Sequence, residues 1–526
     1  MTDQRDAPPQ RRYSRRSILQ RASVGAGIAA LGTTESLASA RTALASPPEK
    51  QAAPDGFGRI FKLPAFAKSS PAVVDALLEI GRPGGVLDAS DALERGPVDL
   101  IVDPALSANN PNNPTSTAGA TFVGQFMDHD LTFDPVSRLG IRPGPDAKNF
   151  RTPAFDLDSV YGRGPIADLH LYEPADGAKL KLESGGLFED LPRSADGRAI
   201  IADPRNDENL ILSGLHSAFL CFHNRGVDYL RARGVIDPVE LYLRARRLTT
   251  WHYQWLILHE FLPQFVGKAL VDLILARGRR FYTVRRDAFM PVEFQAAAFR
   301  FGHSLVRPSY RANLAGDRGK PFFGFVFDVA EAAKPDPGDM SGGVRAPRRF
   351  IGWQTFFDFG DGEVKPNKRV DTKISTPLFN LPGGVIPGLP GLHRGPTALA
   401  QRNFLRHLTW ELPSGQRIAK EMGAPMLSRS DLQELGGLGV GFDRQTPLWY
   451  YVLKEAEIVA DGLHLGPVGG RIVAEVIIGL LKSDPGSYLA VEPRWRPSLP
   501  SRVGGGDFRM TDFLTFAGVD PASRGQ

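Results

Sequence analysis

Residues 121–134 read TFVGQFMDHDLTFD and place one histidine between two aspartates within an apolar segment. In a helix, Gln125 and His129 lie four residues apart and share a face with two phenylalanines. Asp130 directly follows His129, so the helical period turns its side chain roughly 100° away. One short helix could therefore direct a base into a pocket and a carboxylate toward a second site. The plainer interpretation is a helix end with a buried structural histidine and solvated aspartates.

The composition is that of a globular protein with one large domain or a few ordinary ones. Of 526 residues, 42% are hydrophobic and 23% are charged, and the main body has no apolar run long enough to span a bilayer. Cys221 is the only cysteine, which excludes an internal disulfide and a cysteine-ligated iron–sulfur or CxxC metal site. Residues 1–45 hold seven arginines and three acidic residues, so most of the net charge of +5 lies there. This charge gives no reason to expect nucleic-acid binding.

Residues 1–45 have the features of an export signal. Arg15 and Arg16 precede a mildly apolar stretch, and residues 38–40 (ASA) and 43–45 (ALA) both suit cleavage after small residues. The segment resembles a bacterial twin-arginine signal peptide; a disordered basic tail is the alternative. That route exports folded proteins. We therefore expect the twin-arginine export machinery as a partner, no transmembrane segment in the mature chain, and a periplasmic or extracellular location in a bacterium.

Helical periodicity dominates the remainder of the chain, so the predicted fold class is mainly α with few short strands. Residues 46–118 are rich in Pro, Ala, Asp and Asn and are interpreted as an irregular N-terminal arm. Residues 310–395 are rich in Gly, Pro and charge and indicate loops with short elements. No internal repeat is present. We predict one large domain at residues 119–500 and a C-terminal tail at 501–526.

A second group of oxygen ligands occurs in residues 152–162, TPAFDLDSVYG. Thr152, Asp156 and Asp158 offer hard oxygen atoms at short alternating spacing, as a Ca²⁺ loop requires. The spacing is not that of an EF-hand, and no glutamate closes the loop, so a solvated turn is the alternative. Asp130 is a candidate to complete the ligand shell from the first segment.

His259, with the glutamate that follows it, resembles the start of a zinc-protease motif. His259 is followed by Glu260, but Pro263 stands where the second histidine of that motif would be. We therefore interpret both His252 and His259 as structural.

Two further segments carry glycines beside reactive residue types. Residues 296–306 predict an apolar helix with Arg300 and His303 three residues apart, and Gly302 leaves room for something to approach the backbone. Residues 466–470 (GPVGG) lack the strand and the Lys-Ser/Thr of a phosphate-binding loop. They indicate helix punctuation between two helices.

Six stretches, taken together, carry a family resemblance. They are GQFMDHDLTF, TPAFDLDSVYG, DPRNDEN, FHNR, AFRFGHSLV and QRNFLR, in this order along the chain. The chain resembles the animal-type haem peroxidases (the peroxidase–cyclooxygenase superfamily) over roughly residues 60–500. The resemblance implies a single large helical domain around a buried haem b. It also implies a Ca²⁺ site.

The resemblance assigns the roles nearest to the iron. His129 matches the distal histidine, Gln125 the distal glutamine and Arg205 the distal arginine. His303 matches the proximal iron ligand, and Asn403 is expected to accept the hydrogen bond from its other ring nitrogen.

The resemblance also assigns residues at the haem edge. Arg300 and Arg406 fall near the haem propionates. Asp128 and Glu208 fall on carboxylates that become ester-linked to haem in mammalian members, and whether the esters form here stays open. Asn209 stands where one branch has a methionine, which excludes a sulfonium link. The residues that match the calcium ligands are Asp130, Thr152, Ala154 (by its carbonyl), Asp156 and Asp158, the last in place of the usual serine.

These assignments imply a haem-dependent peroxidase that reduces hydrogen peroxide and oxidises a halide, thiocyanate, a phenol or an aromatic amine. The first alternative is a fatty-acid dioxygenase of the same superfamily, which uses a tyrosine three residues before the proximal histidine. Arg300 occupies that position here, which favours the peroxidase. The second alternative is a haem-binding adhesion or matrix protein without turnover. It is disfavoured because His129, Arg205 and His303 are all present.

Overall fold

The computed structural model describes residues 56–135, 137–143, 147–184, 187–284, 287–332, 334–343, 345–385 and 395–526. The signal peptide predicted at residues 1–45 lies outside these ranges. Residues Gln51–Gln526 form one compact unit. Among the described helices, none combines the length and the apolar character needed to cross a bilayer.

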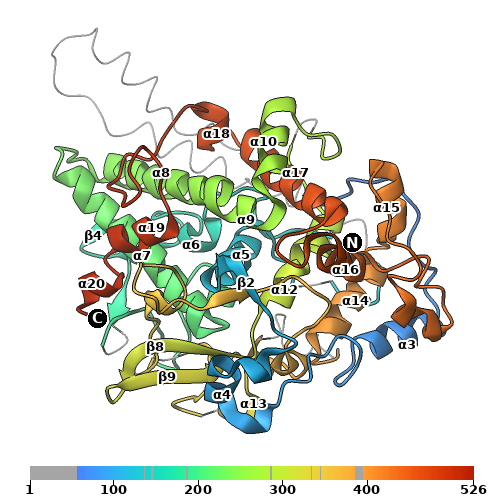
Figure 1. Cartoon of the computed structure of the whole chain (residues 1–526). Helices are drawn as coiled ribbons and strands as arrows, with labels where there is room; N and C mark the ends of the chain where they lie inside the picture. Colours follow the sequence, from blue (N-terminus) through green and yellow to red (C-terminus); the bar gives the residue numbers. More distant parts are fainter. Residues whose placement is uncertain are drawn as a thin grey trace, which may run out of the picture. The chain divides into compact units, whose positions relative to one another are not determined.

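Helices are the main regular structure, at 45% of the residues, and strands are few and short, as the sequence predicted (Figure 1). Helix α5 covers Gly119–Leu131 and contains the histidine between two aspartates. The other longer helices are α3 (Pro71–Ile80), α7 (Leu210–Arg231), α8 (Pro238–Leu256), α10 (Lys268–Arg277), α14 (Leu399–Thr409), α15 (Gly415–Met422), α16 (Leu448–Ala460), α17 (Pro467–Ser483) and α19 (Met510–Ala517). The shorter ones are α4 (Gly96–Val102), α6 (Asp158–Tyr161), α9 (Leu262–Val266), α11 (Val292–Gln295), α12 (Gly302–Leu305), α13 (Val329–Ala332), α18 (Tyr488–Val491) and α20 (Pro521–Arg524).

Strands are short and pair in twos within the described residues. The longest pair is the antiparallel hairpin of β8 (Ser309–Asp317) and β9 (Lys320–Phe325), in the region predicted as loops with short elements. The other pairs are β1 (Phe57–Gly58) with β7 (Met290–Pro291), β2 (Asn112–Thr117) with β10 (Pro366–Lys368), β3 (Tyr172–Glu173) with β4 (Asp176–Leu180), and β5 (Glu183–Ser184) with β6 (Glu189–Asp190).

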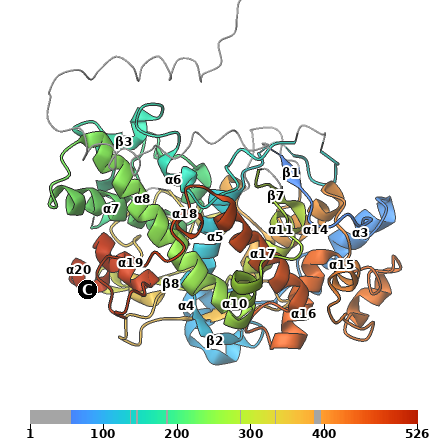
Figure 2. The same ribbon diagram turned by 90° about the horizontal axis from the view of Figure 1, so that it is seen from above.

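Helix α5 packs against α7 and α12. In both views α7 and α8 lie on one side of it and α16 and α17 on the other (Figures 1 and 2). Its apolar face explains this position. Phe126 stacks on Phe219 of α7 with ring centroids 4.5 Å apart, and Phe122 meets the ring edge of Tyr310. Burying each such ring contributes about 1.5–3 kcal/mol. Gly119 begins the helix against the ring of Phe357, where a Cβ would come within 2.4 Å.

The two predicted flanking segments belong to this same unit. In the predicted arm, strand β2 pairs with β10 and helix α3 packs on α14. The segment predicted as a C-terminal tail instead forms helix α19, which packs on α7, and Phe513 stacks on Phe222 at 4.1 Å. The interpretation as a tail missed the apolar spacing of Met510, Phe513 and Leu514, which gives the helix a buried face.

Candidate active site

One cavity collects all nine residues that the sequence assigned to the haem environment. We call the residues contributed by α5 and the 3₁₀ turn Pro204–Asp207 with its following residue the distal group, and those from residues 298–305 and α14 the proximal group. The distal group comprises Gln125, Asp128, His129, Arg205 and Glu208. The proximal group comprises Arg300, His303, Asn403 and Arg406. Apolar side chains such as Phe299, Phe327 and Leu378 line much of the remaining wall.

His129 is buried near the end of α5 and is held at one ring nitrogen. Its Nδ1 lies 2.9 Å from Oδ1 of Asn206, and its Nε2 lies 3.9 Å from Oε2 of Glu208. Burial, with the nearby charge of Arg205, lowers the pKa of His129 from 6.5 to about 4. The imidazole is therefore neutral at pH 7 and can accept a proton.

Arg205 joins the turn Pro204–Asp207 to the end of α5. Its Nη2 donates to the backbone carbonyls of His129, at 3.0 Å, and Thr132, at 2.6 Å. Carbonyl groups at the C-terminal end of a helix lack intrahelical partners, and a cation there is favourable. Arg205 therefore fixes the helix end that carries His129, and it packs over the ring of Phe133.

A fully buried carboxylate, Asp203, holds the guanidinium of Arg205. It accepts from Nε of Arg205 at 3.0 Å and from Nη2 at 2.7 Å. It also accepts from Nη2 of Arg151 at 2.6 Å. Although burial opposes the charge, attraction to the two guanidinium groups keeps the pKa of Asp203 well below its usual range. Asp203 thus stays ionised although its side chain is buried.

Glu208 is the last acceptor in a short chain of side-chain hydrogen bonds that begins at Asn209 and passes through Gln125. Asn209 donates to Oε1 of Gln125 at 3.2 Å, and Nε2 of Gln125 donates to Glu208 at 3.0 Å. Asn209 also accepts from the backbone N–H of Leu212 and so caps α7. Burial raises the pKa of Glu208 to about 8, so this carboxyl is mostly protonated at neutral pH.

His303 lies where the sequence predicted one apolar helix over residues 296–306. The structure divides that stretch into a 3₁₀ turn, Ala298–Phe301, and the short helix α12. Asn403 on α14 donates from Nδ2 to Nδ1 of His303 at 2.7 Å. The direction of this hydrogen bond is opposite to the expected one, in which Asn403 accepts from His303. The reason is that Oδ1 of Asn403 already accepts from Arg300 at 3.2 Å.

Buried guanidinium groups surround His303 with little negative charge. Arg300 donates only to neutral acceptors, the backbone carbonyl of Gln295 and the amide of Asn403. Burial and the neighbouring charge of Arg406 lower the pKa of Arg300 to about 9. Burial also lowers the pKa of Arg406, against attraction from Asp134 and Asp128. A cavity with under-compensated cations is suited to an anionic ligand group.

These features fit a haem. Burial, with repulsion from Arg300 and Arg406, lowers the pKa of His303 well below 6.5, so its imidazole is the neutral form that binds metals. A Cβ added at the adjacent Gly302 would meet no atom within 4 Å, so there is space at the ring. The apolar walls would suit a porphyrin and the arginines its propionates.

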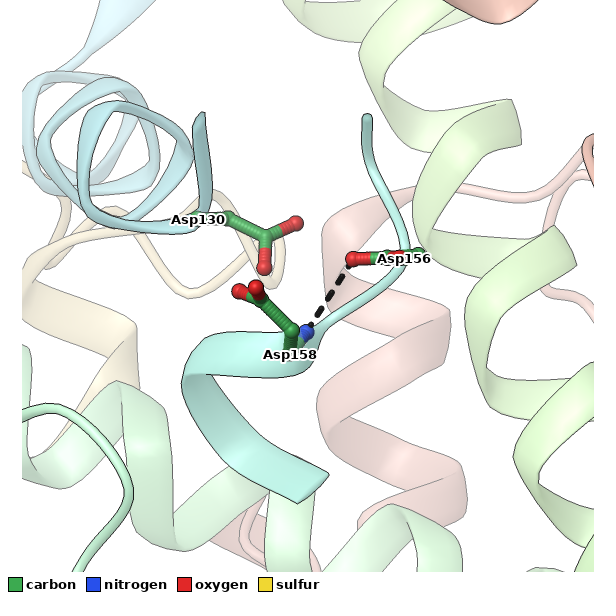
Figure 3. A group of neighbouring side chains, drawn as sticks. All are labelled: Asp130, Asp156 and Asp158. Carbon is green, nitrogen blue, oxygen red and sulfur yellow. Dashed lines mark hydrogen bonds between the residues drawn. The ribbon is translucent and has the colours of Figure 1, made fainter. Parts of the chain in front are cut away.

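The loop predicted to bind Ca²⁺ approaches the far face of α5. Oxygen atoms of Asp130, Asp156 and Asp158 lie within 4.8 Å of one another, and Figure 3 shows the three carboxylates converging. Burial and mutual repulsion raise the pKa of Asp130 well above its usual range and that of Asp158 to about 7. Oδ1 of Asp158 is buried without a hydrogen-bond partner among the described residues. The donor set therefore fits a hard cation.

Thr152 and Ala154 lie in the same loop. The backbone N–H of Thr152 donates to Asp158, and that of Ala154 donates to the carbonyl of Thr152. The loop is also tied to the cavity, because Nη1 of Arg151 lies 3.8 Å from Oδ1 of Asp158 while Nη2 of Arg151 donates to Asp203.

Sequence reasoning missed four residues that organise the distal group. Asn206 and His216 lie behind His129, and Asp203 and Arg151 lie behind Arg205. Asp203 and Asn206 flank Arg205 in the DPRNDEN stretch, which was the available signal. Nothing local marks Arg151 or His216 as their partners.

The histidines of the zinc-protease-like pattern and the glycine-rich stretch at residues 466–470 both have structural roles. His259 stacks on Trp255 with ring centroids 3.7 Å apart, and Nδ1 of His252 donates to the backbone carbonyl of Leu248 at 2.7 Å. Neither histidine belongs to a metal-type cluster in the described residues. The helix punctuation predicted at residues 466–470 is also present: α17 begins there, and the carboxylate of Glu455 accepts its first backbone N–H groups at 2.9–3.2 Å.

Comparison with known proteins gives the family. Residues 142–321, which include Arg205, Glu208 and His303, match the profile of the animal haem peroxidase family. This region is an animal haem peroxidase domain. The chorion peroxidase of Aedes aegypti is 35% identical to the chain over 218 residues, which are 38% of this chain and 27% of that protein. The chain spans 27% or less of the curated relatives it first matches.

Solved structures extend the similarity of the peroxidase domain to most of the chain. Peroxidase A from Dictyostelium discoideum has a TM-score of 0.58 at 17% identity, with 87% of this chain and 92% of that chain covered. The fatty acid alpha-dioxygenase of Arabidopsis thaliana has a TM-score of 0.50 at 16% identity, with 73% and 70% covered. At these identities the structures demonstrate a shared fold, which is mainly α and peroxidase-like.

Proposed function

We propose that the chain is a haem-dependent peroxidase that reduces hydrogen peroxide and oxidises small donors: a halide, thiocyanate, a phenol or an aromatic amine. The observation that carries the proposal is the presence of His129, Arg205 and His303 in the lining of one cavity. Family membership supports oxidoreductase chemistry in general. The particular donors rest on this proposal alone.

Bound haem would supply the redox-active iron, and His303 would hold it. For Nε2 of His303 to bind iron, Nδ1 must carry the proton, so Asn403 must present Oδ1 rather than Nδ2 to it. The two ends of an amide have similar shape, and a half-turn of the side chain exchanges them. Arg300 would then keep its bond to the carbonyl of Gln295 and, with Arg406, bind the propionates.

The distal residues would handle the proton and the charge. Neutral His129 accepts the peroxide proton at Nε2 and returns it to the departing oxygen, so the same group acts first as a base and then as an acid. Arg205 stabilises the negative charge that develops on that oxygen in a site with little water. Asp128 and Glu208 both line the cavity, and mass spectrometry of the denatured haem-loaded chain tests whether either forms an ester link to the haem.

A fatty-acid dioxygenase is the second candidate, since the alpha-dioxygenases of Arabidopsis thaliana and Oryza sativa share the fold. No tyrosine lines the cavity among the described residues here, and Arg300 stands three residues before His303. These observations favour the peroxidase over the dioxygenase.

Stopped-flow mixing of the haem-loaded chain with hydrogen peroxide tests the proposal. Wild type should change its haem spectrum rapidly, and added phenol or halide should reverse the change. His129→Ala should slow the reaction by about 10²–10⁴-fold. His252→Ala, which removes an equally buried histidine outside the cavity, is the matched control and should react like wild type.

A wild type that does not react would contradict the peroxidase. Oxygen uptake with a fatty acid would then support the dioxygenase, and a haem spectrum without either activity would support a binding protein.

We also propose that Asp130, Asp156 and Asp158, with Thr152 and the carbonyl of Ala154, bind Ca²⁺. Because Asp130 adjoins His129, the ion would fix the end of α5. A strong chelator should slow the peroxide reaction and lower the thermal midpoint, and added Ca²⁺ should restore both. Asp158→Ser should weaken Ca²⁺ binding in calorimetry. Indifference of both rate and midpoint to the chelator would contradict the site.

Finally, we propose that residues 1–45 direct export by the twin-arginine route to the periplasm or beyond. Replacing Arg15 and Arg16 together by lysine should retain the chain in the cytoplasm of a bacterial host. Export of the double variant at the wild-type level would contradict this proposal.

A further inference from the structure

Asn206 connects two buried histidines through the two ends of its amide. Its Oδ1 lies 2.9 Å from Nδ1 of His129, and its Nδ2 lies 3.0 Å from Nδ1 of His216. Asn206 and His129 come from elements 77 residues apart in sequence, and all three side chains are buried. A buried amide has few alternative hydrogen-bond partners, so its orientation affects which nitrogen of each ring carries hydrogen.

The orientation of this amide determines which nitrogen of His129 carries the proton. Oδ1 can only accept, so Nδ1 of His129 must carry hydrogen, and Nε2 is then the ring's lone-pair nitrogen. Nδ2 can only donate, so Nδ1 of His216 must be unprotonated. Burial lowers the pKa of His216 to about 4, which keeps that ring neutral and able to accept. With the amide reversed, Nε2 of His129 would carry hydrogen and could not take up another proton.

We propose that Asn206, which also donates to His216, is the positioning residue that holds His129 in the tautomer with Nε2 as proton acceptor. The inference rests on the proposed peroxidase function and adds to it a residue that acts through His129. Asn206 does not contact the reacting atoms.

The proton movements balance under this assignment. Nε2 of His129 takes the proton from one peroxide oxygen and gives it to the other, which already carries one hydrogen and leaves as water. Bound haem, held by His303, would supply the two electrons that this cleavage consumes, and the small donor would replace them. The hydrogen on Nδ1 stays on the ring throughout. Oδ1 of Asn206 keeps its hydrogen bond to Nδ1 and also stabilises the positive charge while both nitrogens are protonated.

Two substitutions at Asn206 separate orientation from packing. Asn206→Leu keeps the number and branching of the side-chain heavy atoms and removes both hydrogen bonds, so His129 loses its fixed tautomer. Asn206→Asp keeps an acceptor at Nδ1 of His129 and adds a charge, so the tautomer is kept and the pKa of His129 rises. The matched control is Asn224→Leu on α7, which removes two 2.8 Å bonds to the backbone of Leu180.

The first readout is independent of turnover. In the ¹⁵N-histidine-labelled full chain loaded with zinc protoporphyrin, which is diamagnetic, we expect a protonated Nδ1 and an unprotonated Nε2 at His129. Asn206→Leu should show both tautomers, and Asn206→Asp and Asn224→Leu only the wild-type one. A protonated Nε2 in wild type, or an unchanged tautomer in Asn206→Leu, would overturn the inference.

The second readout is the peroxide rate of the iron-loaded chain as a function of pH. Asn206→Leu should lose about 100-fold at pH 7 with haem retention unchanged. Asn206→Asp should stay within about 10-fold, with the acid limb of its profile moved to higher pH. Wild-type rates in Asn206→Leu would overturn the inference. Failure of wild type to react would instead contradict the peroxidase, while the tautomer would still be measurable.

Discussion

Each cavity histidine is the first member of a histidine–asparagine–histidine series, and the two series have opposite polarity. In the distal group, Asn206 presents Oδ1 to His129 and Nδ2 to His216. In the proximal group, Asn403 presents Nδ2 to its cavity histidine and accepts at Oδ1 from an arginine. The second histidine of the proximal series, His407, meets Asn403 through its backbone carbonyl instead of its amide, at 2.9 Å, and accepts from the backbone N–H of Trp449.

The partner on the far side of each asparagine differs. Neutral His216 accepts from the amide N–H₂ in the tautomer that leaves its Nδ1 unprotonated. The guanidinium of Arg300 can only donate, so it draws the amide oxygen. The two histidine–asparagine pairs therefore have opposite hydrogen-bond directions in the protein without haem.

The charge balance around the two series also differs. In the distal group, the ionised Asp203 pairs with both Arg205 and Arg151. In the proximal group, Arg300 has only neutral acceptors. The distal arginine therefore has a carboxylate partner within the protein, whereas a bound anionic ligand would supply the counter-charge of the proximal group.

The largest expected difference between the two groups is in their contribution to haem affinity. His303→Ala should weaken haem binding by more than about 100-fold, since losing even a partner of a metal ligand costs about 10–100-fold. His129→Ala should bind haem like wild type. Spectroscopic titration at the Soret band measures both. Equal retention in His303→Ala and wild type, with the same band, would show that the proximal assignment is wrong.

Removing the buried carboxylate of Asp203 should destabilise the distal group in the chain without haem. Asp203→Asn leaves two buried guanidinium groups without a counter-charge, which should lower the free energy of unfolding by about 3–5 kcal/mol. Urea denaturation of the full chain measures this. Asp196→Asn removes an exposed carboxylate paired with Arg198 and should unfold like wild type. A small effect at Asp203 would mean that the two arginines find other partners.

His216 and His407, the second histidines of the two series, should each reduce the stability of the folded chain by a similar amount as pH falls. Burial lowers the pKa of His216 and of His407 from 6.5 to about 4. Between pH 6.5 and 4 the unfolded chain binds a proton at each position and the folded chain does not, so stability falls by about 3 kcal/mol per histidine as pH falls. His216→Gln and His407→Gln should each lose less stability than wild type between pH 7 and pH 4. Unequal changes would show that one ring titrates in the folded chain.

The smallest expected effect concerns the proximal amide. Asn403→Leu should weaken haem binding by about 10–100-fold, because Nδ1 of His303 loses its partner. Asn403→Asp should retain binding, since a carboxylate accepts from both His303 and Arg300. Titration with haem compares the three chains. Wild-type affinity in the leucine variant would mean that the amide does not support the ligand.

Much of this organisation could be predicted because it is local. The helical period places His129 and Asp130 in different directions, and the structure has one facing the cavity and the other the acidic cluster. The apolar spacing of α5, α16 and α17 likewise predicted helices, and the mainly α fold is confirmed. The segment 510–517 was interpreted as a tail although the spacing of Met510, Phe513 and Leu514 is that of a buried helix face; only its partner, α7, lies far away in sequence.

The sequence by itself determined which residue types are available and, through helical spacing and order along the chain, which of them face the cavity. The tertiary structure decided what each polar group is bonded to. The bonds of Asn206 to His129, of Arg300 to Asn403 and of Arg151 to Asp203 join residues 77, 103 and 52 positions apart. An amide or a buried guanidinium takes its partner from whatever donor or acceptor the packed chain brings within about 3 Å, and no local pattern records that distance.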